Sequence, residues 1–344
     1  MKFIDLFAGI GGFRLGFENA NFECVFSSEI DEHAKKMYFE NFNDMPYSDI
    51  TKIDEKNIPE HNILLAGFPC QPFSISGKKL GFEDTRGNLF FEIIRIIKEK
   101  QPEIIVLENV KHFKNHDKGR TLKIVLKSLE DLGYTTSWKV LNAKDFGVPQ
   151  NRERTIIIGN RNGLKFNFNK LVKNQKLSIE SILDIENSNF EYLEENEYTL
   201  IENYKKQESG LIFVGYRNKK IRQKGTKANT EHLSRVHKQP NRIYSSKGTH
   251  PTLASQETAG RYFIYHNGRV RKITINECFK LMGFPETFKL VGTKGNLYNR
   301  IGNSIVVSMV EEIARNIRLQ FLENNNKEHD IFFELENGQL CMNL

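Results

Sequence analysis

One cysteine of this chain lies in a setting that favours chemistry. Cys70 follows the apolar, strand-like run NILLAGF and belongs to the segment GFPCQPFS, so it lies in a loop beyond the carboxyl end of a strand. Open α/β sheets bind their ligands at that edge. We predict Cys70 as a nucleophile, because a thiolate attacks readily and later leaves. A lone cysteine is more often a small buried hydrophobe, and Cys24, inside an apolar run, is interpreted in that way.

Charged side chains lie at the ends of two further apolar runs. Glu108 ends the run EIIVLEN, and a buried carboxyl group at a strand end can have a raised pKa and donate a proton. We predict that Glu108 is the partner of Cys70. Arg152 and Arg154, in the segment QNRER, open another run and could orient a base or hold a phosphate by paired hydrogen bonds. A surface ion pair with Glu153 is the alternative for one of them.

The first apolar run, KFIDLF, leads into a glycine-rich turn, FAGIGG, at residues 7–12. Its glycines allow a tight turn and the close approach of a nucleotide-like ligand beside a helix N-terminus, although tight packing alone is an alternative. Arg14 stands where the dinucleotide fingerprint requires glycine, which weakens an NAD interpretation. Glu29, at the end of the second run, is placed to accept hydrogen bonds from two ribose hydroxyls, and Asp49 could lie near an adenine.

These residues need a sheet to position them, and the first 160 residues predict one. Helical patterns at 88–100 and 121–132 alternate with buried strand patterns, which indicates an α/β fold with a doubly wound, mostly parallel sheet. The expected strands are the runs KFIDLF, ECVFSSE, NILLAGF, EIIVLEN, SWKVLNA and RTIIIGN.

The remainder of the chain has a different pattern. Residues 160–204 are rich in Asn, Lys and Glu, and the short pieces LIFVGY, NRIYSS and RYFIYH then predict a small, mostly β lobe. A helix is expected at 274–282, and a long helix capped by Asn303 or Ser304 should return to the first domain. The predicted division is a catalytic domain at 1–180 and 300–325, a second domain at 181–270, a hinge segment at 271–299 and a tail at 326–344.

Charge and composition narrow the class of protein. Residues 211–272 carry a net charge of about +12, whereas the whole chain carries +7. The remainder is therefore acidic, and one lobe is suited to a polyanion.

The cysteines and histidines argue against metal or disulfide chemistry. The four cysteines include no CxxC pair, which argues against a disulfide framework or a cysteine zinc site. His112 and His116 lack the glutamate of an HExxH motif, so no metal is predicted. With neither a signal peptide nor a membrane span, we expect a cytoplasmic protein.

The motifs also occur in a familiar order. In that order, DLFAGIGGF, GFPCQPFS, ENV, QNRER, RKITINECFKLMGFP and YNRIGNS resemble the C5-cytosine DNA methyltransferase family, especially its small bacterial restriction-modification members. The resemblance extends to about Phe321 and rests on several ordered motifs, which together are far more specific than any one of them. Arg300 is a departure, because the family often has glutamine at that position.

The resemblance implies a class I methyltransferase fold that binds S-adenosylmethionine, with residues 181–270 as the target recognition domain. Cys70, Glu108 and Arg152 would act on a flipped cytosine, with Arg154 in support. The residues implied around the cofactor are Phe7, Gly9, Ile10, Gly11, Gly12, Glu29, Ile30, Asp49, Ile50, Pro69, Leu89, Asn303 and Ser304. Those implied to contact DNA are Ser74, Ser76, Gln239, Arg242 and Tyr244.

The same resemblance implies a monomer that acts on double-stranded DNA and has a cognate restriction endonuclease, and it favours a short, GC-containing palindrome as the target. An RNA cytosine-5 methyltransferase is one alternative, although the long basic segment favours duplex DNA. An inactive DNA-binding relative is another, but every expected catalytic residue is present. The chain has no Pro-Pro pair, which an amino-group methyltransferase would need in its DPPY-like motif.

Overall fold

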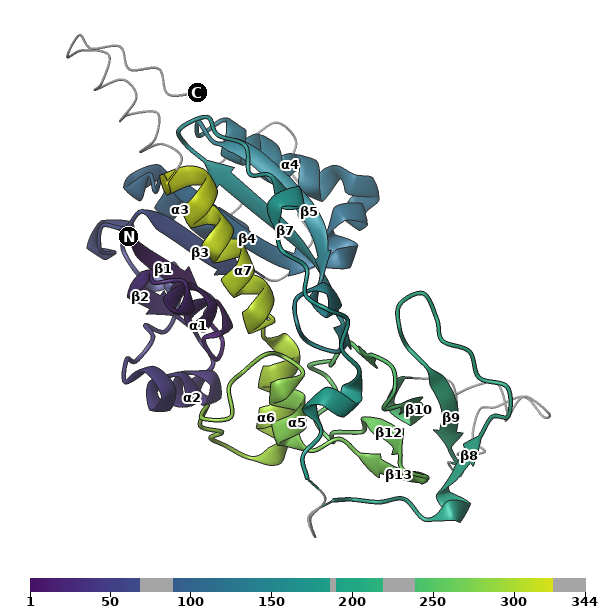
Figure 1. The fold of residues 1–344 in the computed structure, drawn as a ribbon. Helices are drawn as coiled ribbons and strands as arrows, with labels where there is room; N and C mark the ends of the chain where they lie inside the picture. The colour runs from purple at the N-terminus through teal and green to yellow at the C-terminus, as the bar shows by residue number, and fades with distance from the viewer. Residues whose placement is uncertain (69–88, 186–189, 219–238, 324–344) are drawn as a thin grey trace, which may run out of the picture.

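The computed structural model describes residues 1–68, 89–185, 190–218 and 239–323, and Figure 1 shows them as two lobes. The larger lobe contains a six-stranded sheet in the order β2-β1-β3-β4-β7-β5. The first three pairings are parallel and the last two are antiparallel. Five of the six strands run in the same direction and β7 runs against them, because it folds back and inserts between β4 and β5, so the sheet is mixed but mostly parallel. Its strands are β1 (Lys2–Leu6), β2 (Glu23–Ser28), β3 (Ile63–Gly67), β4 (Ile104–Val110), β5 (Thr135–Asn142) and β7 (Glu153–Asn160).

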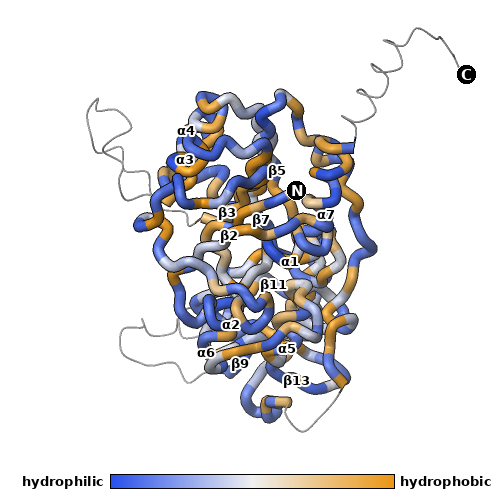
Figure 2. Tube along the Cα trace, turned by 90° about the vertical axis from the view of Figure 1, so that its left-hand side faces the viewer, coloured by the Kyte–Doolittle hydropathy of each residue, from blue (hydrophilic) through white to orange (hydrophobic). Residues whose placement is uncertain are grey.

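Helices cover both faces of this sheet. Neighbouring residues of a strand point to opposite faces, and in β3 Leu64 packs into one hydrophobic cluster while Leu65 packs into the other. α3 and α4 belong to the cluster of Leu64, and α1, α2 and α7 belong to that of Leu65. Figure 2 shows hydrophobic strands inside a more polar surface. The bounds are α1 (Gly12–Asn19), α2 (Glu32–Phe42), α3 (Leu89–Lys100), α4 (Arg120–Glu130) and α7 (Val307–Ile317).

The smaller lobe is built on a five-stranded sheet in the order β13-β12-β10-β9-β8. Val214, Ile243, Phe263 and Val270 form its small buried core. A two-stranded pairing of β11 (His250–Pro251) with β6 (Gln150–Asn151) ties this part of the chain to the larger lobe. The three pieces LIFVGY, NRIYSS and RYFIYH contain most or all of β9, β10 and β12, so the strands predicted there are confirmed. The strands of this lobe are β8 (Tyr198–Leu200), β9 (Phe213–Arg217), β10 (Arg242–Ser245), β12 (Phe263–His266) and β13 (Arg269–Lys272).

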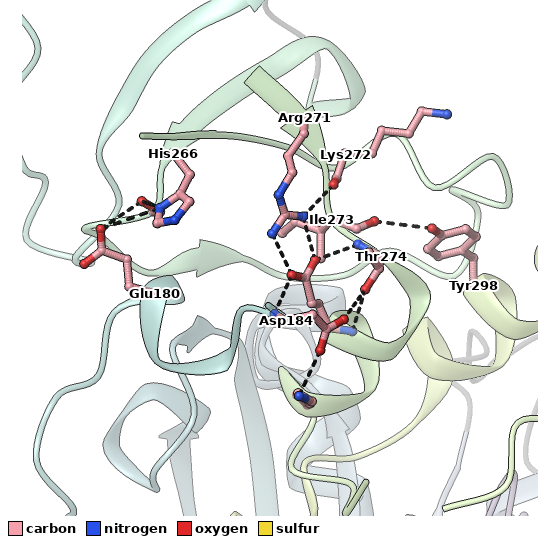
Figure 3. Close-up of polar contacts among 11 residues, drawn as sticks. Glu180, Asp184, His266, Arg271, Lys272, Ile273, Thr274 and Tyr298 are labelled. Atoms are coloured by element: carbon pink, nitrogen blue, oxygen red, sulfur yellow. Dashed lines mark hydrogen bonds and ion pairs between the residues drawn. The ribbon is translucent and has the colours of Figure 1, made fainter. Parts of the chain in front are cut away.

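A buried ion pair joins the smaller sheet to the helices between the lobes (Figure 3). Arg271 of β13 donates two hydrogen bonds of 2.8 and 2.7 Å to Glu277 of α5 (Ile275–Lys280), and both side chains are almost fully buried. The same carboxylate accepts the backbone N–H groups of Thr274 and Asp184. These four hydrogen bonds to the Glu277 carboxylate offset part of the desolvation cost of burying the two charges.

One expectation about the C-terminal helices is wrong. α7 begins at Val307 after Val306, and neither Asn303 nor Ser304 caps it. Asn303 instead ends a further helix, α6 (Lys294–Asn303), with Ser304 at its C-cap. Three asparagines and two glycines give α6 a low intrinsic helix propensity, so tertiary packing of its buried residues must stabilise it. Those residues are Leu297, Tyr298, Ile301 and Gly302.

Short helical turns complete the described structure. No helix within the described ranges is both long and apolar enough to cross a membrane. The 3₁₀ turns are Ile50–Lys52, Glu55–Asn57, Lys111–Gly119, Ala143–Asp145, Phe168–Lys170, Ile179–Ile182, Glu195–Glu197 and Gln239–Asn241, and the π-helical turn is Arg318–Glu323.

Candidate active site

A pocket of about 710 Å³ opens at the carboxyl ends of β1, β2, β3 and β4. This is the edge at which open α/β sheets bind ligands, and the volume suits a nucleotide-sized molecule. The pocket brings together residues from both ends of the chain. Of the residues predicted around the cofactor, those that line it are Phe7, Gly9, Ile10, Glu29, Ile30, Asp49, Ile50, Leu89, Asn303 and Ser304.

The glycine-rich turn forms one side of this pocket. Gly11 has φ +86° and is the N-cap of α1, a left-handed conformation that favours glycine. A Cβ atom on Gly12 would lie 2.8 Å from the hydroxyl oxygen of Ser304, so glycine is needed for the close approach of the 304 segment. Gly9 and Ile10 line the pocket itself. Gly11 and Gly12 do not line it, but they allow the backbone conformation and the close packing of the turn.

Glu29 follows β2 and is held in place by the backbone. Its two oxygens accept hydrogen bonds of 2.8 Å from the N–H groups of Asp31 and Gly9. Burial raises the pKa of this carboxyl group, while the two N–H groups and the charge of Arg300 act in the opposite direction. Each carboxylate oxygen can accept more than one hydrogen bond, so Glu29 keeps acceptor capacity for a ligand.

Glu108 and Arg154 form an ion pair that lines the same pocket. Arg154 Nε lies 2.7 Å from Glu108 Oε1, and both side chains are largely buried. The register explains the contact, because Glu108 is opposite Ile156 and Arg154 is opposite Val110, which makes the pair diagonal neighbours on one face. Burial raises the pKa of Glu108, and the positive charges of Arg154 and Arg152 oppose this shift.

Arg152 lies outside the pocket lining and has a different environment. Its fully buried guanidinium donates hydrogen bonds to the carbonyl oxygens of Leu253 (3.0 Å), Gly302 (2.8 Å) and Ser304 (2.6 Å). These bonds connect the start of β7 with a segment after β11 and with the end of α6. Arg152 thus holds two parts of the pocket lining in position.

Asn109 is a site residue that the sequence did not single out. Its buried side-chain amide donates a 2.8 Å hydrogen bond to the carbonyl oxygen of Phe68, and its oxygen accepts the N–H of Val110. Asn109 therefore anchors the chain where it leaves β3 for the segment that carries Cys70. The sequence feature that could have identified Asn109 is its position directly after Glu108.

Four predicted residues, Pro69, Cys70, Ser74 and Ser76, lie outside the described residues. The register pairs Gly67 at the end of β3 with Glu108, so the chain leaves the sheet for Cys70 beside the Glu108–Arg154 pair. The two cysteines that are described are poor nucleophiles. Burial raises the pKa of the Cys24 thiol to about 12 and raises that of the buried Cys278 thiol as well.

The described residues that were predicted to contact DNA belong to the smaller sheet or lie just before it. Tyr244 is buried against Phe213 and His250, and its hydroxyl lies 3.4 Å from the side-chain oxygen of Gln239. Tyr244 is therefore covered by neighbouring side chains in the DNA-free protein, and its contact with DNA stays a prediction. Arg242 is half-buried, with its guanidinium 5.8 Å from the centre of the Phe213 ring.

Comparisons with known proteins identify the family of this chain. The family model described as C-5 cytosine-specific DNA methylase matches residues 1–319. Type II methyltransferase M.HhaI of Haemophilus parahaemolyticus is 41% identical, over 92% of this chain and 94% of its own. Type II methyltransferase M.NgoBI of Neisseria gonorrhoeae is 40% identical, over 95% and 96%.

A solved structure gives the same fold. A putative DNA modification methyltransferase encoded within a prophage of E. coli covers 94% of this chain and 100% of its own, with a TM-score of 0.67 and 22% identity. The structural likeness bears on the fold alone, whereas the family match and the relatives near 40% identity cover most of the sequence. The chain belongs to the C-5 cytosine-specific DNA methylase family.

Proposed function

We propose that this chain is the modification methyltransferase of a restriction-modification system and methylates C5 of cytosine in double-stranded DNA. The observation that carries the proposal is the buried Glu108–Arg154 pair, which shares one pocket with Glu29 and adjoins the strand end that leads to Cys70. An acid, a planar cation and a nucleophile are the groups that a pyrimidine ring needs for addition at C6.

The pocket fits S-adenosylmethionine. Glu29 has acceptor capacity for ribose hydroxyls, the exposed Ile30 offers an apolar surface for an adenine, and Asn303 and Ser304 also line the pocket. Asp49 already accepts hydrogen bonds from the hydroxyl and N–H of Thr51, and these lower its pKa, so it is an anionic acceptor at neutral pH. When bound, the cofactor supplies an electrophilic methyl group.

The reaction begins with addition of Cys70 to the ring, because C5 of cytosine is itself a poor nucleophile. The Cys70 thiolate forms a bond to C6 while Glu108 donates a proton to N3, which makes C5 electron-rich. After C5 has gained the methyl group, a base removes the C5 proton, the bond between sulfur and C6 breaks, and the N3 proton returns to Glu108. The product is 5-methylcytosine, and the thiolate is regenerated.

We assign the cytosine carbonyl oxygen to Arg154 and not to Arg152. Arg154 uses Nε for Glu108 and has further N–H donors that can bind a carbonyl within the pocket. The guanidinium of Arg152 instead binds three backbone carbonyls and is absent from the pocket lining. We therefore propose that Arg152 positions the segments around the site.

The smaller lobe is proposed as the target recognition domain, within the boundaries 181–270, with 271–299 as a hinge between it and the catalytic parts at 1–180 and 300–325. Its sequence carries the positive charge that phosphate contacts require. A cytosine inside a duplex must rotate out of the stack at a cost of a few kcal/mol, which DNA contacts from this lobe would offset. We further propose that the enzyme acts as a monomer in the cytoplasm and is paired with a cognate endonuclease.

Bisulfite sequencing of plasmid DNA from cells that express the chain tests this function. We expect protected cytosines at every copy of one short sequence, which also identifies the target. A plasmid without protected cytosines would contradict the proposal. Purified enzyme should transfer labelled methyl groups to duplex DNA and not to tRNA, and the reverse preference would favour an RNA methyltransferase.

Replacing Glu29 with alanine should weaken S-adenosylmethionine binding roughly 10- to 100-fold, because charge-assisted hydrogen bonds are lost. The change should leave the turnover rate at saturating cofactor almost unaltered. Isothermal titration calorimetry of the DNA-free protein measures the binding. Glu40→Ala, at an exposed position of α2, is the matched control and should bind like the wild type. An unchanged affinity in Glu29→Ala would remove Glu29 from the cofactor site.

A further inference from the structure

Arg300 stands on α6 at the position where the family often has glutamine, and it lines the pocket. Its terminal nitrogen lies 2.6 Å from Asp31 Oδ2, and both side chains are largely buried. The Nε atom of Arg300 is buried and has no hydrogen-bond partner among the described residues. The ion pair thus joins two sides of the pocket, one from the C-terminal part of the chain and one from the turn after β2.

Asp31 connects Arg300 to Glu29. It is the N-cap of α2, where Oδ1 accepts the N–H of Ala34 at 2.8 Å, so that its other oxygen is available to Arg300. The backbone N–H of Asp31 donates to Glu29 Oε1 at 2.8 Å. Two anchors therefore fix Asp31, and Asp31 in turn fixes Glu29 opposite Gly9.

We propose that Arg300 is a positioning residue for the cofactor, and that its ion pair with Asp31 holds Glu29 in the orientation that binds the ribose. The inference rests on the proposed function, because it concerns the same S-adenosylmethionine site. Arg300, the residue that departs from the family pattern, is then a determinant of cofactor affinity in this chain.

The charges around Glu29 support this role. Three carboxyl groups converge here: the fully buried Asp5 on β1, Glu29 after β2, and Asp31 at the start of α2. Burial raises the pKa of both Asp5 and Glu29; the negative charge of Glu29 also raises the pKa of Asp5, and that of Asp31 raises the pKa of Glu29. Arg300 is the cation that α6 brings to this group, and its charge favours the ionised form of Glu29.

A double-mutant cycle tests the proposal. Cofactor affinity is measured by calorimetry on the DNA-free protein for the wild type, Arg300→Gln, Glu29→Gln and the double variant. We expect Arg300→Gln to weaken S-adenosylmethionine binding about 5- to 20-fold, with the turnover rate at saturating cofactor within about twofold of the wild type. In the Glu29→Gln background the same change should have less than about a twofold effect, because residues that act as a unit are not additive.

Three further measurements distinguish this role from a purely structural link between α6 and the start of α2. Arg300→Lys should restore part of the affinity, and Arg315→Ala, which removes an exposed arginine from α7, should have no effect. In Arg300→Gln, the pKa of Glu29 should rise further, so that binding weakens at a higher pH than in the wild type as the pH is lowered. A loss of thermal stability alone would not move this pH dependence.

The outcomes are distinct. Equal losses of affinity from Arg300→Gln in both backgrounds, an unshifted pH dependence, or wild-type affinity in Arg300→Gln would overturn the role of Arg300. A wild-type protein that failed to bind S-adenosylmethionine would instead contradict the proposed function.

Discussion

Cys70→Ala is expected to abolish methyl transfer, with a loss of roughly four orders of magnitude or more, because the proposed reaction begins with addition of the Cys70 thiolate to C6 of the cytosine. Only Pro69 separates Cys70 from Phe68, and two residues span at most about 7 Å. The Phe68 carbonyl is fixed by Asn109, next to Glu108. The chain that leads to Cys70 therefore leaves the described sheet beside Glu108. Binding of S-adenosylmethionine should persist in the variant, because Glu29 and the glycine turn are untouched.

Duplex DNA with 5-fluorocytosine at the target gives the decisive measurement. Fluorine cannot leave as a proton does, so the wild-type enzyme should remain covalently attached to the DNA in denaturing gels and by mass spectrometry. Cys70→Ala should form no adduct. Cys24→Ala is the matched control and should keep its activity, because burial raises the pKa of the Cys24 thiol to about 12. Normal turnover by Cys70→Ala would end the proposed mechanism.

Local patterns predicted the elements that position the site. In α4, Leu122, Val125 and Leu129 are buried on one stripe, and Gly133 adopts a left-handed conformation after the helix, as expected from the spacing and from the glycine. The strand ends placed Glu29 and Glu108 correctly at one edge of the sheet, because parallel neighbouring strands end on the same side. Periodicity and turn residues are encoded within a few positions, so sequence suffices to find them.

Contacts between distant segments could not be predicted in this way. Arg152 and Arg154 are two positions apart on the chain, yet one binds carbonyl groups about 100 and 150 residues away while the other pairs with Glu108. The register of β7 against β4 decides which of the two arginines faces Glu108, and no local pattern specifies that register. The helix α6 was missed for a similar reason, since its stability comes from packing. A Cβ atom on Gly302 would lie 2.5 Å from the Ser255 backbone nitrogen, which shows how closely that helix approaches a distant segment.

Glu108→Gln is expected to lower the turnover rate about 10²- to 10⁴-fold, the usual contribution of a general acid. Glutamine has the same shape and can still accept the hydrogen bond from Arg154, but its amide N–H is far too weak an acid to transfer a proton to N3. Cofactor affinity should stay within about twofold of the wild type, because Glu29 is unchanged. Single-turnover methyl transfer measures the effect. Glu153→Gln, which removes an exposed partner of Lys111 from the same strand as Arg154, is the matched control and should be fully active.

The pH dependence identifies the proton donor. Burial raises the pKa of Glu108, so its protonated form persists to higher pH than that of an ordinary glutamate, and activity should fall as the pH rises through this pKa. Arg154 lowers the same pKa, so Arg154→Ala should move the alkaline decline to higher pH while it weakens cytosine binding. Glu108→Gln should lose this decline altogether. A decline that moved to lower pH in Arg154→Ala, or that survived in Glu108→Gln, would assign the proton to another group, because only a carboxyl group paired with Arg154 responds to both changes in these directions.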